Sequence, residues 1–453
     1  MKTENKFIHN LILKVKDEQF TLKVSEWAGQ ERYISSSASA FPGKWKNTLT
    51  PYMVEIMDNF SDTSNIQQVA VMKATQVGFT AGVIENAIGY TIAHSPCPSM
   101  FVSSTEELAK DAVETRIEPM LENSGLSHKI FSQAVNTRNK RTGNKTTKKE
   151  FAGGFLLIRG GKSASGLRSM SIKNLFMDEI DAMTDDLKEG DMIDLAFQRT
   201  KSFGKKKKVL YGSTPLIQQT SKIYKLYLRG DQRKYYVPCP KCDEIQVLVF
   251  DDKKTGAGLK FKKDKEGNLI YDSVGYQCCK CGEIWKNREK TEILAKGEWR
   301  TTATAKEQNY RSYHISALYS PPSMYSWEEM ARDWIYAQKS IDKLRPFINL
   351  QLGEPWEERG ESPKYERVMS RKHDYDIDSV PDGVLFLTGA CDIQKDCIYI
   401  EILGHGERRI TWSINWVKLE GSTESLNQGA WEKLDKFIEY LSPGSFDVIW
   451  HKI

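Results

Sequence analysis

The sequence lacks any apolar run long enough to cross a membrane, and its first residues, "MKTENKFIHN", lack the apolar core of a secretory signal. A membrane-spanning helix needs about 20 mostly apolar residues, and a signal peptide needs an apolar stretch after its basic start. These two absences exclude a membrane-spanning protein and a secreted one. We therefore expect a protein of the cytoplasm that has no membrane partner.

A strong excess of charge of one sign is also missing, because 65 Lys and Arg stand against 60 Asp and Glu. Such a balance does not by itself argue for a nucleic-acid partner, since only clustered charge makes an electrostatic footprint. Two local clusters exist, the lysine-rich stretches 138–149 and 205–208. We expect both to lie on loops that meet DNA. Solvated loops that keep the protein soluble are the alternative.

Cysteine is scarce, with eight in 453 residues, which excludes the dense disulfide framework of a small secreted protein. Four of the eight form two C-x-x-C pairs with 35 residues between them, Cys239 with Cys242 and Cys278 with Cys281. Four thiolates at this spacing are typical of a structural zinc site of the ribbon type, which has no open position for a catalytic water. A redox-active pair is the alternative, and Cys279 competes with Cys278 for the fourth ligand position.

Apolar strand-like runs alternate with helical stretches between residues 65 and 227. The runs are "QQVAVMKA", "SMFVSS", "FLLIRG", "NLFMDE" and "KVLYGSTP", and "TEELAKDAVETRIEPMLENS" is a helical stretch between two of them. This alternation predicts an α/β fold with a parallel sheet. No internal repeat is present, and the length predicts about two to four domains.

The stretch "MKATQVGFT", residues 72–80, follows the first run where a phosphate-binding loop would lie. In the usual motif, G-x-x-x-x-G-K-[ST], a lysine after the second glycine reaches the phosphates and the hydroxyl holds magnesium. Here Gly78 and Thr80 fit, Phe79 replaces the lysine, and Lys73 stands where the first glycine would be. Lysine is a flexible point charge, so Lys73 is able to reach the phosphates from the other side of the loop.

Two later runs end in the residues that a nucleotide-hydrolysing site needs. Asp178 and Glu179 follow "NLFM", where one acid would hold the hydrated magnesium and the other would orient the attacking water. The run "VLYGSTP" ends in small polar residues, Ser213 and Thr214, that suit sensing of the γ-phosphate. Together with the loop, this order predicts a P-loop-type ATPase domain.

Two further residues complete the predicted nucleotide-binding set. Gln76 lies within the loop. Arg168, in "GGKSASGLRS", offers a guanidinium to a phosphate or to a DNA backbone. An exposed loop arginine without such a role is the alternative for Arg168.

Ordered motifs along nearly the whole chain resemble one known family, the large terminase subunits of tailed bacteriophages, specifically the lambda-type branch. The lead segment "SEWAGQERYISSSASAFPGKWKNTLTPYMVEIMDNFSD" is similar to that branch. The motifs that follow in the family's order are "YTIAHSPCPSMFVSSTEELAKD", "SGLRS", "MDEID", "GSTP", "YYVPCPKC", "YQCCKCG", "HISALYSP", "FINLQLGEPWEE" and "LTGACDIQKD".

The resemblance implies an ATP-driven motor that translocates double-stranded viral DNA into a procapsid, and a nuclease that cuts the concatemer. Its implied cofactors are ATP, Mg²⁺ and Zn²⁺. Its implied partners are duplex DNA, the small terminase subunit, the portal protein and further copies in a ring, in the cytoplasm of a bacterial host. Asp178 is then the magnesium-binding acid, Glu179 the catalytic acid, and 212–215 the segment that couples hydrolysis to movement. Many relatives carry lysine where Phe79 stands, so the hydrolysis rate is the open question.

The C-terminal part, "GVLFLTGACDIQKDCIYIEILGHGERRITWSINW", predicts three strands of a meander with Asp392 near the end of the first. An RNase H-like nuclease begins in this way, and later acids join the first to hold two metal ions. By resemblance Asp392 is the first nuclease acid and a magnesium ligand, while the family places its remaining acids further downstream. We therefore expect a truncated chain whose ATPase survives and whose nuclease does not.

The predicted division of the chain is a lead segment (1–60), an ATPase core (61–235), a zinc-ribbon insertion (236–300), the end of the ATPase domain with a connector (301–384), and an incomplete RNase H-like α/β domain (385–453). A DNA helicase or translocase with a zinc ribbon is one alternative. A zinc-dependent DNA-binding regulator with an α/β scaffold is another.

Overall fold

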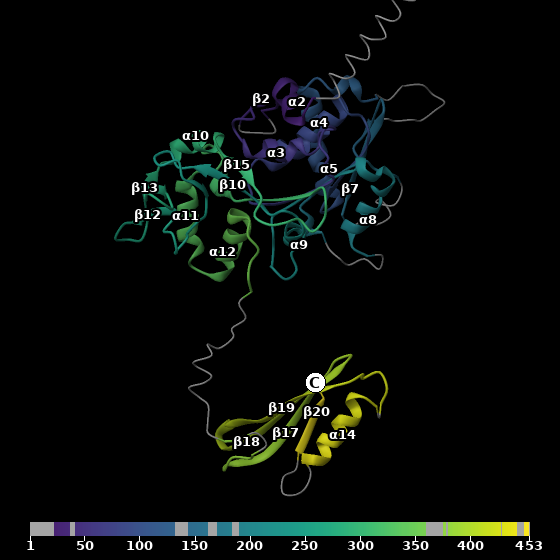
Figure 1. Ribbon diagram of the computed structural model, residues 1–453, viewed down its shortest axis with the longest axis vertical. Helices are drawn as coiled ribbons and strands as arrows, with labels where there is room; N and C mark the ends of the chain where they lie inside the picture. The colour runs from purple at the N-terminus through teal and green to yellow at the C-terminus, as the bar shows by residue number, and fades with distance from the viewer. Residues whose placement is uncertain are drawn as a thin grey trace, which may run out of the picture. The chain divides into compact units, whose positions relative to one another are not determined.

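The chain divides into two units, Met1–Glu358 and Arg359–Ile453 (Figure 1). The computed structural model describes residues 22–36, 41–131, 144–161, 170–183, 190–358, 375–376, 379–426, 428–441 and 448–452. In these ranges, no helix has both the length and the apolar character that a membrane crossing requires.

A mixed sheet forms the centre of the first unit. Its strands follow the order β11-β10-β16-β3-β9-β8-β4-β7-β6-β5, which ends in the short edge strand β5 (Asn144–Lys145). Neighbours from β16 to β7 are parallel, and the flanking pairs β10–β11, β6–β7 and β5–β6 are antiparallel. The central strands are β16 (Tyr310–Ile315), β3 (Gln68–Lys73), β9 (Lys208–Ser213), β8 (Asn174–Asp178), β4 (Pro98–Ser103) and β7 (Gly154–Gly160). The predicted α/β class is confirmed, as a mixed sheet with a parallel centre.

Every residue of β3, β8 and β9 is buried, because helices cover both faces of the sheet. Alternate residues of each strand enter different cores. Val69 and Val71 of β3 pack into one apolar cluster, whereas Ala70 and Met72 pack into the other. The first cluster is covered by α2 (Val24–Glu31), α3 (Tyr52–Asp58), α4 (Asn86–Ala93), α5 (Glu106–Ala112) and α6 (Glu118–Asn123), and the second by α8 (Met192–Gln198) and α9 (Lys222–Arg229).

The helix predicted from "TEELAKD" begins where its sequence places a cap. The Thr105 hydroxyl accepts a hydrogen bond from the Leu108 amide at 3.2 Å, which satisfies one amide of the first turn. The helix then continues through α5, a π-helical turn η2 (Val113–Ile117) and α6.

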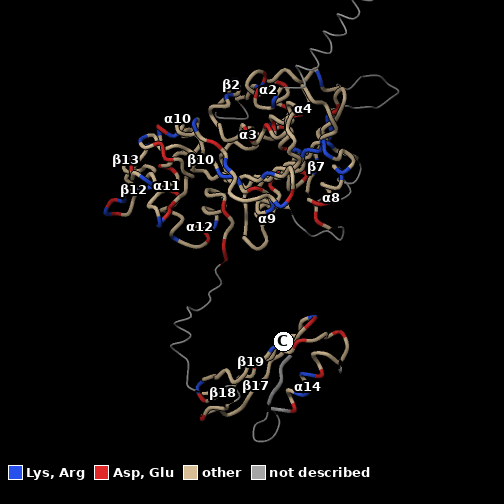
Figure 2. The backbone as a smooth tube through the Cα atoms, viewed as in Figure 1, with Lys and Arg blue, Asp and Glu red and all other residues tan. Residues whose placement is uncertain are grey.

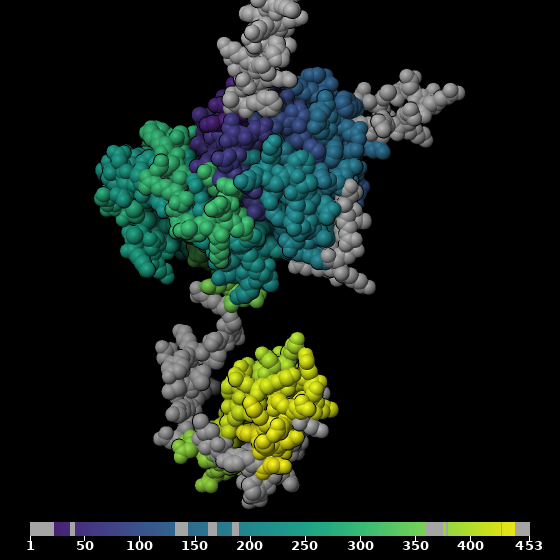
Figure 3. Space-filling model, turned by 45° about the vertical axis from the view of Figure 1, so that its right-hand side comes forward, coloured from purple at the N-terminus to yellow at the C-terminus, as the bar shows by residue number. Residues whose placement is uncertain are grey.

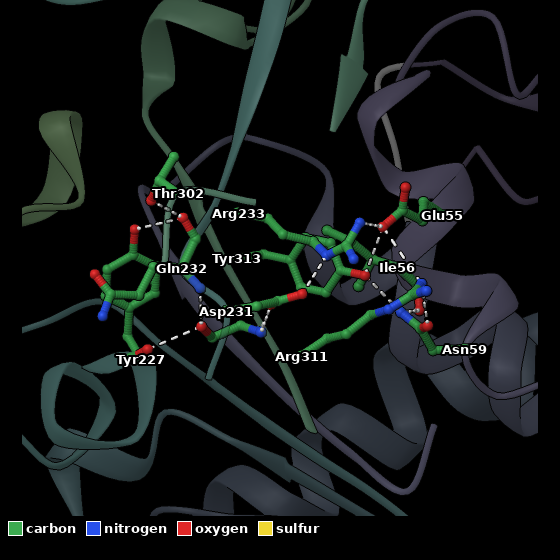
Figure 4. A network of polar contacts seen from close by, with 11 residues as sticks. Glu55, Ile56, Asn59, Tyr227, Asp231, Gln232, Arg233, Thr302, Arg311 and Tyr313 are labelled. Atoms are coloured by element: carbon green, nitrogen blue, oxygen red, sulfur yellow. Dashed lines mark hydrogen bonds and ion pairs between the residues drawn. The ribbon is translucent and has the colours of Figure 1, made fainter. Parts of the chain in front are cut away.

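A polar network ties the lead helix α3 to two strands of the sheet (Figure 4). Glu55 of α3 accepts hydrogen bonds from Arg233 Nη1 and from the Tyr313 hydroxyl, both at 2.9 Å. Arg233 also pairs with Asp231 at 2.7 Å. The charges are therefore matched across the contact, and α3 is held in register with β10 (Arg233–Pro238) and β16.

A lobe that contains the four paired cysteines extends from the β10 edge and forms part of the teal and green surface in Figure 3. It holds β11 (Ile245–Val247), the three-stranded sheet of β12 (Gly258–Lys263), β13 (Leu269–Gln277) and β14 (Ile284–Trp285), then α10 (Lys290–Ala295) and β15 (Glu298–Arg300). Helix α11 (Trp327–Ala337) packs on β13, where the Trp327 ring lies 5.7 Å from Tyr276. Helix α12 (Ile341–Pro346) and the π-helical turn η8 (Phe347–Leu352) follow.

The second unit is a four-stranded sheet of order β19-β18-β17-β20 with one helix on it. β17 (Val384–Ile393), β18 (Cys397–Gly406) and β19 (Thr411–Glu420) form the antiparallel meander, and β20 (Val448–Lys452) pairs with β17 in parallel. Helix α14 (Ala430–Leu441) covers one face through a small apolar core that includes Leu387, Ile400 and Leu434.

Two lysines of the lysine-rich stretches lie in strands and are buried, so the prediction that they lie on exposed loops is wrong. Lys149 lies in β6 (Lys148–Phe151), where it is 1% exposed and pairs with Glu118. Lys208 begins β9 and donates hydrogen bonds to the carbonyls of Asn59, Ser64 and Ile66. A run of lysines predicts exposure, but here tertiary partners compensate two of the charges. Residues 138–143 lie outside the described residues.

Candidate active site

The loop after β3 turns sharply before the helix that begins with η1 (Thr80–Glu85), a π-helical turn continued by α4. Gln76 and Gly78 have positive φ angles of 57° and 75°. At Gly78 the turn is also crowded, because a Cβ atom there would lie 3.2 Å from Thr50 Cγ2. This strand–loop–helix arrangement presents backbone amides at a helix N-terminus, which is a favourable site for an anion.

Three strands bring their polar ends together at the carboxyl edge of the sheet. Lys73 ends β3, Asp178 ends β8 and Ser213 ends β9, which lies between them. Lys73 Nζ lies 2.7 Å from Glu179 Oε1 and 4.0 Å from Asp178 Oδ1. Thr80 Oγ1 donates a hydrogen bond to Asp178 Oδ2 at 3.3 Å. The predicted loop and the predicted acids therefore form one cluster.

Glu179 has an unusual backbone conformation for a residue that is not glycine, with φ 53° and ψ 50°. Its carboxylate accepts hydrogen bonds from the Thr214 amide at 3.4 Å and from the Thr214 and Ser213 hydroxyls at 3.3 and 3.4 Å. Such backbone strain persists only where the surroundings enforce it. The predicted segment 212–215 thus holds Glu179, whose side chain is 40% exposed, at the rim of the cluster.

Burial and charge set the protonation of the cluster. Burial lowers the pKa of Lys73, but the carboxylates of Asp178 and Glu179 outweigh it and leave that pKa above its ordinary value. Burial raises the pKa of Asp178, and Lys73 offsets only part of this rise. Burial also acts to raise the pKa of Glu179, yet the contact with Lys73 brings it below the ordinary value. Lys73 is therefore a cation and Glu179 an anion at neutral pH.

Phe79 is built into the site. Its side chain is 3% exposed, and its ring centroid lies 5.3 Å from Lys73 Nζ. Gly212 leaves room for the ring, because a Cβ atom there would come within 2.4 Å of Phe79 Cε1. The Lys73 ammonium at the end of β3 therefore lies close to Phe79, the residue that stands where the usual motif has its lysine.

A segment that sequence reasoning assigned no chemical role supports the loop from outside. In the 347–356 segment, the Leu350 carbonyl accepts hydrogen bonds from Thr75 N at 2.7 Å and Thr75 Oγ1 at 3.0 Å. Trp356 N donates to the Leu216 carbonyl at 2.8 Å, just after the 212–215 segment. The 347–356 segment therefore contacts both the loop after β3 and the residue that follows the 212–215 segment. The motif "FINLQLGEPWEE" was visible in sequence, but its contacts are made by backbone atoms.

Asp181 is a second residue without a predicted role. Its carboxylate accepts hydrogen bonds from Leu216 N at 3.0 Å and Ile223 N at 2.7 Å. Its own amide donates to Ser213 Oγ at 3.2 Å. Asp181 therefore fixes the segment after β9 relative to the acids that end β8. Arg168 lies outside the described residues.

The four paired cysteines converge in the cysteine lobe, with their sulfur atoms all within 4.8 Å of one another. The two turns that carry them are alike. Cys239 N donates to the Glu244 carbonyl at 2.8 Å and Cys278 N donates to the Glu283 carbonyl at 2.9 Å. Cross-turn ion pairs repeat the symmetry, Lys241 with Glu283 at 2.7 Å and Lys280 with Glu244 at 2.8 Å. Cys279 is outside the set of four.

Asp392 lies on β17 opposite Tyr399 of β18 and is exposed. Its neighbours in sequence and register, Cys391 and Ile400, are buried in the core under α14, so Asp392 belongs to the other face of the sheet. Gln394 Nε2 donates a hydrogen bond to Asp392 Oδ2 at 2.9 Å. Throughout the described ranges, the cysteines are the one set of three or more His, Cys, Asp or Glu side chains whose ligand atoms meet.

Comparisons with known proteins agree on one family. Residues 39–299 match the family model "Phage terminase large subunit gpA, ATPase domain", and residues 310–443 match "Terminase large subunit gpA, endonuclease domain". The chain is 28% identical to the terminase large subunit of Escherichia phage lambda over 411 residues, and 27% identical to that of Enterobacteria phage P21 over 402 residues. These alignments cover 86% and 84% of this chain.

The chain spans 61% of the length of the lambda protein and 60% of the P21 protein. Among solved structures, the HK97 bacteriophage large terminase is similar with a TM-score of 0.44 and 10% identity, over 95% of this chain and 74% of that chain. The large terminase ATPase domain of Thermus phage P74-26 is similar with a TM-score of 0.36 and 11% identity, over 66% and 91%. The family models together match most of the sequence, and the chain belongs to the gpA family of phage terminase large subunits.

Proposed function

We propose that the first unit binds and hydrolyses ATP with Mg²⁺ and uses the energy to move double-stranded DNA into a viral procapsid. One observation carries this proposal: Lys73, Asp178 and Glu179 meet at the carboxyl edge of a parallel sheet, within the region that matches the ATPase family model. The test is ATP hydrolysis by the chain with and without duplex DNA. Hydrolysis that duplex DNA leaves unchanged would contradict a DNA motor, and strand separation would favour the helicase alternative.

Different residues of this chain have different roles in phosphoryl transfer. Lys73 binds the phosphates, with the backbone of Gln76 and Gly78 shaping the loop around them. Thr80 and Asp178, which are hydrogen-bonded to each other, would be the protein ligands for magnesium. The ion, when bound, neutralises charge on the phosphate oxygens. Glu179 orients the attacking water.

The ion pair between Lys73 and Glu179 means that nucleotide binding would precede the release of Glu179. Lys73 Nζ and Glu179 Oε1 lie 2.7 Å apart, so each group is an ionic partner of the other. An arriving phosphate gives Lys73 a second anionic partner, which weakens its hold on Glu179. The carboxylate is then available to a water molecule, while Ser213 and Thr214 keep it in place. Nucleotide binding thus releases the base that hydrolysis needs.

Gly353 is where the 347–356 segment comes closest to the loop. It has φ +65°, and a Cβ atom there would lie 2.7 Å from Ala74 N and 2.9 Å from Lys73 C. We expect Gly353→Ala to displace Lys73 and to lower the turnover number for ATP by roughly 10- to 100-fold. Gly125→Ala is the matched control, because Gly125 has φ +67° with open space around its Cβ position. Equal turnover in the two variants would show that the 347–356 segment does not position the loop.

We propose that the four cysteines hold one structural zinc ion, as in a zinc ribbon. Their convergence and the two matching turns support this, and tetrahedral thiolate sites of this kind are closed to catalysis.

Replacing Cys239, Cys242, Cys278 or Cys281 by serine is expected to reduce bound zinc from about one ion per chain to near zero and to unfold the cysteine lobe locally. Cys279→Ser is the control and should retain the metal. Elemental analysis of the purified protein measures both. Metal-replete protein without zinc would reject the site, and loss of zinc in Cys279→Ser would reject this ligand set.

We propose that the second unit is the RNase H-like part of an endonuclease, with Asp392 as one acid of its magnesium site. An antiparallel meander, a helix and a returning parallel strand support the fold, and the match to the endonuclease family model supports the activity. Asp392→Asn is expected to abolish any cleavage of plasmid DNA that depends on Mg²⁺ or Mn²⁺, since a metal site that used Asp392 would lose one of its carboxylate ligands. Cleavage that survives this substitution would contradict the role of Asp392.

We also propose the division into a lead segment, an ATPase core, a zinc ribbon, a connector and a nuclease domain, with boundaries after residues 60, 235, 300 and 384. The proposed partners are the small terminase subunit, the portal protein and further copies of this chain in a ring, in the cytoplasm of the bacterial host. Co-sedimentation with purified portal and small subunit would test the first two contacts, and failure of both to associate would contradict them.

A further inference from the structure

A groove with a volume of about 930 Å³ lies at the amino ends of the central strands. It is lined by residues at or just before the starts of five of them, which are Gln67 before β3, Ser95 and Pro96 before β4, Lys173 before β8, Lys208 in β9 and Asn309 before β16. Because the strands are parallel, this edge of the sheet is opposite to the edge that carries the candidate nucleotide site.

The residues that line the groove are of polar or charged types, with one exception. Small-molecule pockets are mostly apolar, with few polar groups. Here Pro96 is the single apolar member and Asp62 the single carboxylate, and all other members carry hydroxyl, amide, imidazole or ammonium groups. The members not yet named are Thr63, Ser64, Asn65, His94, Lys205 and Lys206. Side chains of this kind are those that contact phosphate and sugar in protein–DNA complexes.

Four lysines face one aspartate in this lining, so the groove is basic. The charges differ in how they are held. Lys208 is buried and fixed by three backbone carbonyls, and burial lowers its pKa to about 8. Lys173 neutralises Asp62 at 2.9 Å. Lys205 and Lys206 are exposed, and no carboxylate of the described residues forms an ion pair with either.

Figure 2 shows basic and acidic residues interspersed along the described backbone of the first unit. The groove is therefore distinguished by composition and shape together. It also sits at one end of the strands whose other ends carry Lys73, Asp178 and Ser213. A ligand bound by Lys173 and Lys208 would contact the amino ends of β8 and β9.

We infer that this groove binds the phosphate backbone of duplex DNA, with Lys205 and Lys206 as its phosphate contacts and Lys208 as a fixed cation in its wall. The inference rests on the proposed motor function and gives that function a DNA contact at the sheet edge away from the nucleotide. An acidic protein partner is the alternative occupant of this groove. In that case the substitutions described below would leave the affinity for DNA unchanged.

The test is the affinity of the chain for a random-sequence duplex across a series of salt concentrations. Each phosphate contact contributes about 0.9 to the slope of log affinity against log salt. Lys205→Gln/Lys206→Gln is therefore expected to reduce that slope by about 1.8 and to weaken binding at least about 10-fold at low salt. Lys253→Gln/Lys254→Gln is the matched control, since these exposed lysines lie on the turn between β11 and β12 and give the same change of charge.

Both double variants should keep the ATP hydrolysis rate of the parent in the absence of DNA, because neither touches the candidate active site. An unchanged slope and affinity in Lys205→Gln/Lys206→Gln would overturn the inference, and so would equal losses in the two variants. If DNA still stimulates hydrolysis in that case, the motor function stands without this groove. A parent chain that does not hydrolyse ATP at all would instead overturn the proposed function.

Discussion

Glu179→Ala is expected to abolish ATP turnover while nucleotide binding remains. Its carboxylate is held by the Thr214 amide and by two hydroxyls at the rim of the cluster, where it is 40% exposed and able to meet a water molecule. Orienting that water stabilises the transition state and not the ground state, so the loss should fall on the turnover number. A fall of about 100- to 10,000-fold is the usual range for a group in this role.

Two further variants make this result interpretable. Glu179→Gln keeps a hydrogen-bond acceptor for Thr214 but removes the charge, so it should be nearly as inactive as the alanine variant. Glu266→Ala removes an exposed glutamate from the turn between β12 and β13 and should match the parent. The measurements are phosphate release and the dissociation constant of a non-hydrolysable ATP analogue. Parental turnover in Glu179→Gln would end the assignment of this residue.

The sequence was sufficient to predict the parts of the site that depend on local pattern. Alternating apolar runs predicted the strands because a buried parallel strand is apolar along its whole length. Lys73, Asp178 and Ser213 could be placed at one edge because the carboxyl ends of parallel strands share an edge. The insertion of β9 between β3 and β8 was not predictable, since strand order depends on how the connecting helices pack on the two faces.

The parts that sequence reasoning missed are those made by backbone atoms or by distant partners. The 347–356 segment supports the loop through the Leu350 carbonyl and the Trp356 amide, and any residue type offers these groups. Lys208 resembles its neighbours in a lysine run, yet three carbonyls from the turn before β3 bury its ammonium. Such contacts cannot be predicted from the identity of the side chains alone.

Lys73→Ala is expected to reduce the catalytic efficiency for ATP by about 100-fold or more, in line with the loss of a preorganised charge at a transferring phosphoryl group. Within the loop "MKATQVGFT" it is the single cation, because Phe79 fills the usual lysine position. Its side chain is 7% exposed, and its ammonium lies 2.7 Å from Glu179 and 4.0 Å from Asp178. No other side chain of the loop is able to supply this charge.

Moving the charge back provides the sharpest control. In Lys73→Ala/Phe79→Lys, a lysine stem replaces the buried ring, whose centroid lies 5.3 Å from the original ammonium. The double variant should therefore recover part of the activity that Lys73→Ala loses. Lys73→Met keeps the length of the side chain without its charge and should remain as inactive as the alanine variant.

The same variants separate catalysis from folding. Removing Lys73 leaves the carboxylates of Asp178 and Glu179 next to each other without a cation. Their mutual repulsion raises the pKa values of the two groups, and it lowers the stability of the folded state until one of them takes up a proton. Thermal unfolding should thus show a loss that shrinks as the pH falls toward the range where carboxyl groups protonate, whereas the loss of ATP hydrolysis should persist at every pH. An ATPase rate that is insensitive to Lys73→Ala would show that the phosphates are bound by another group and that the loop is not the nucleotide site.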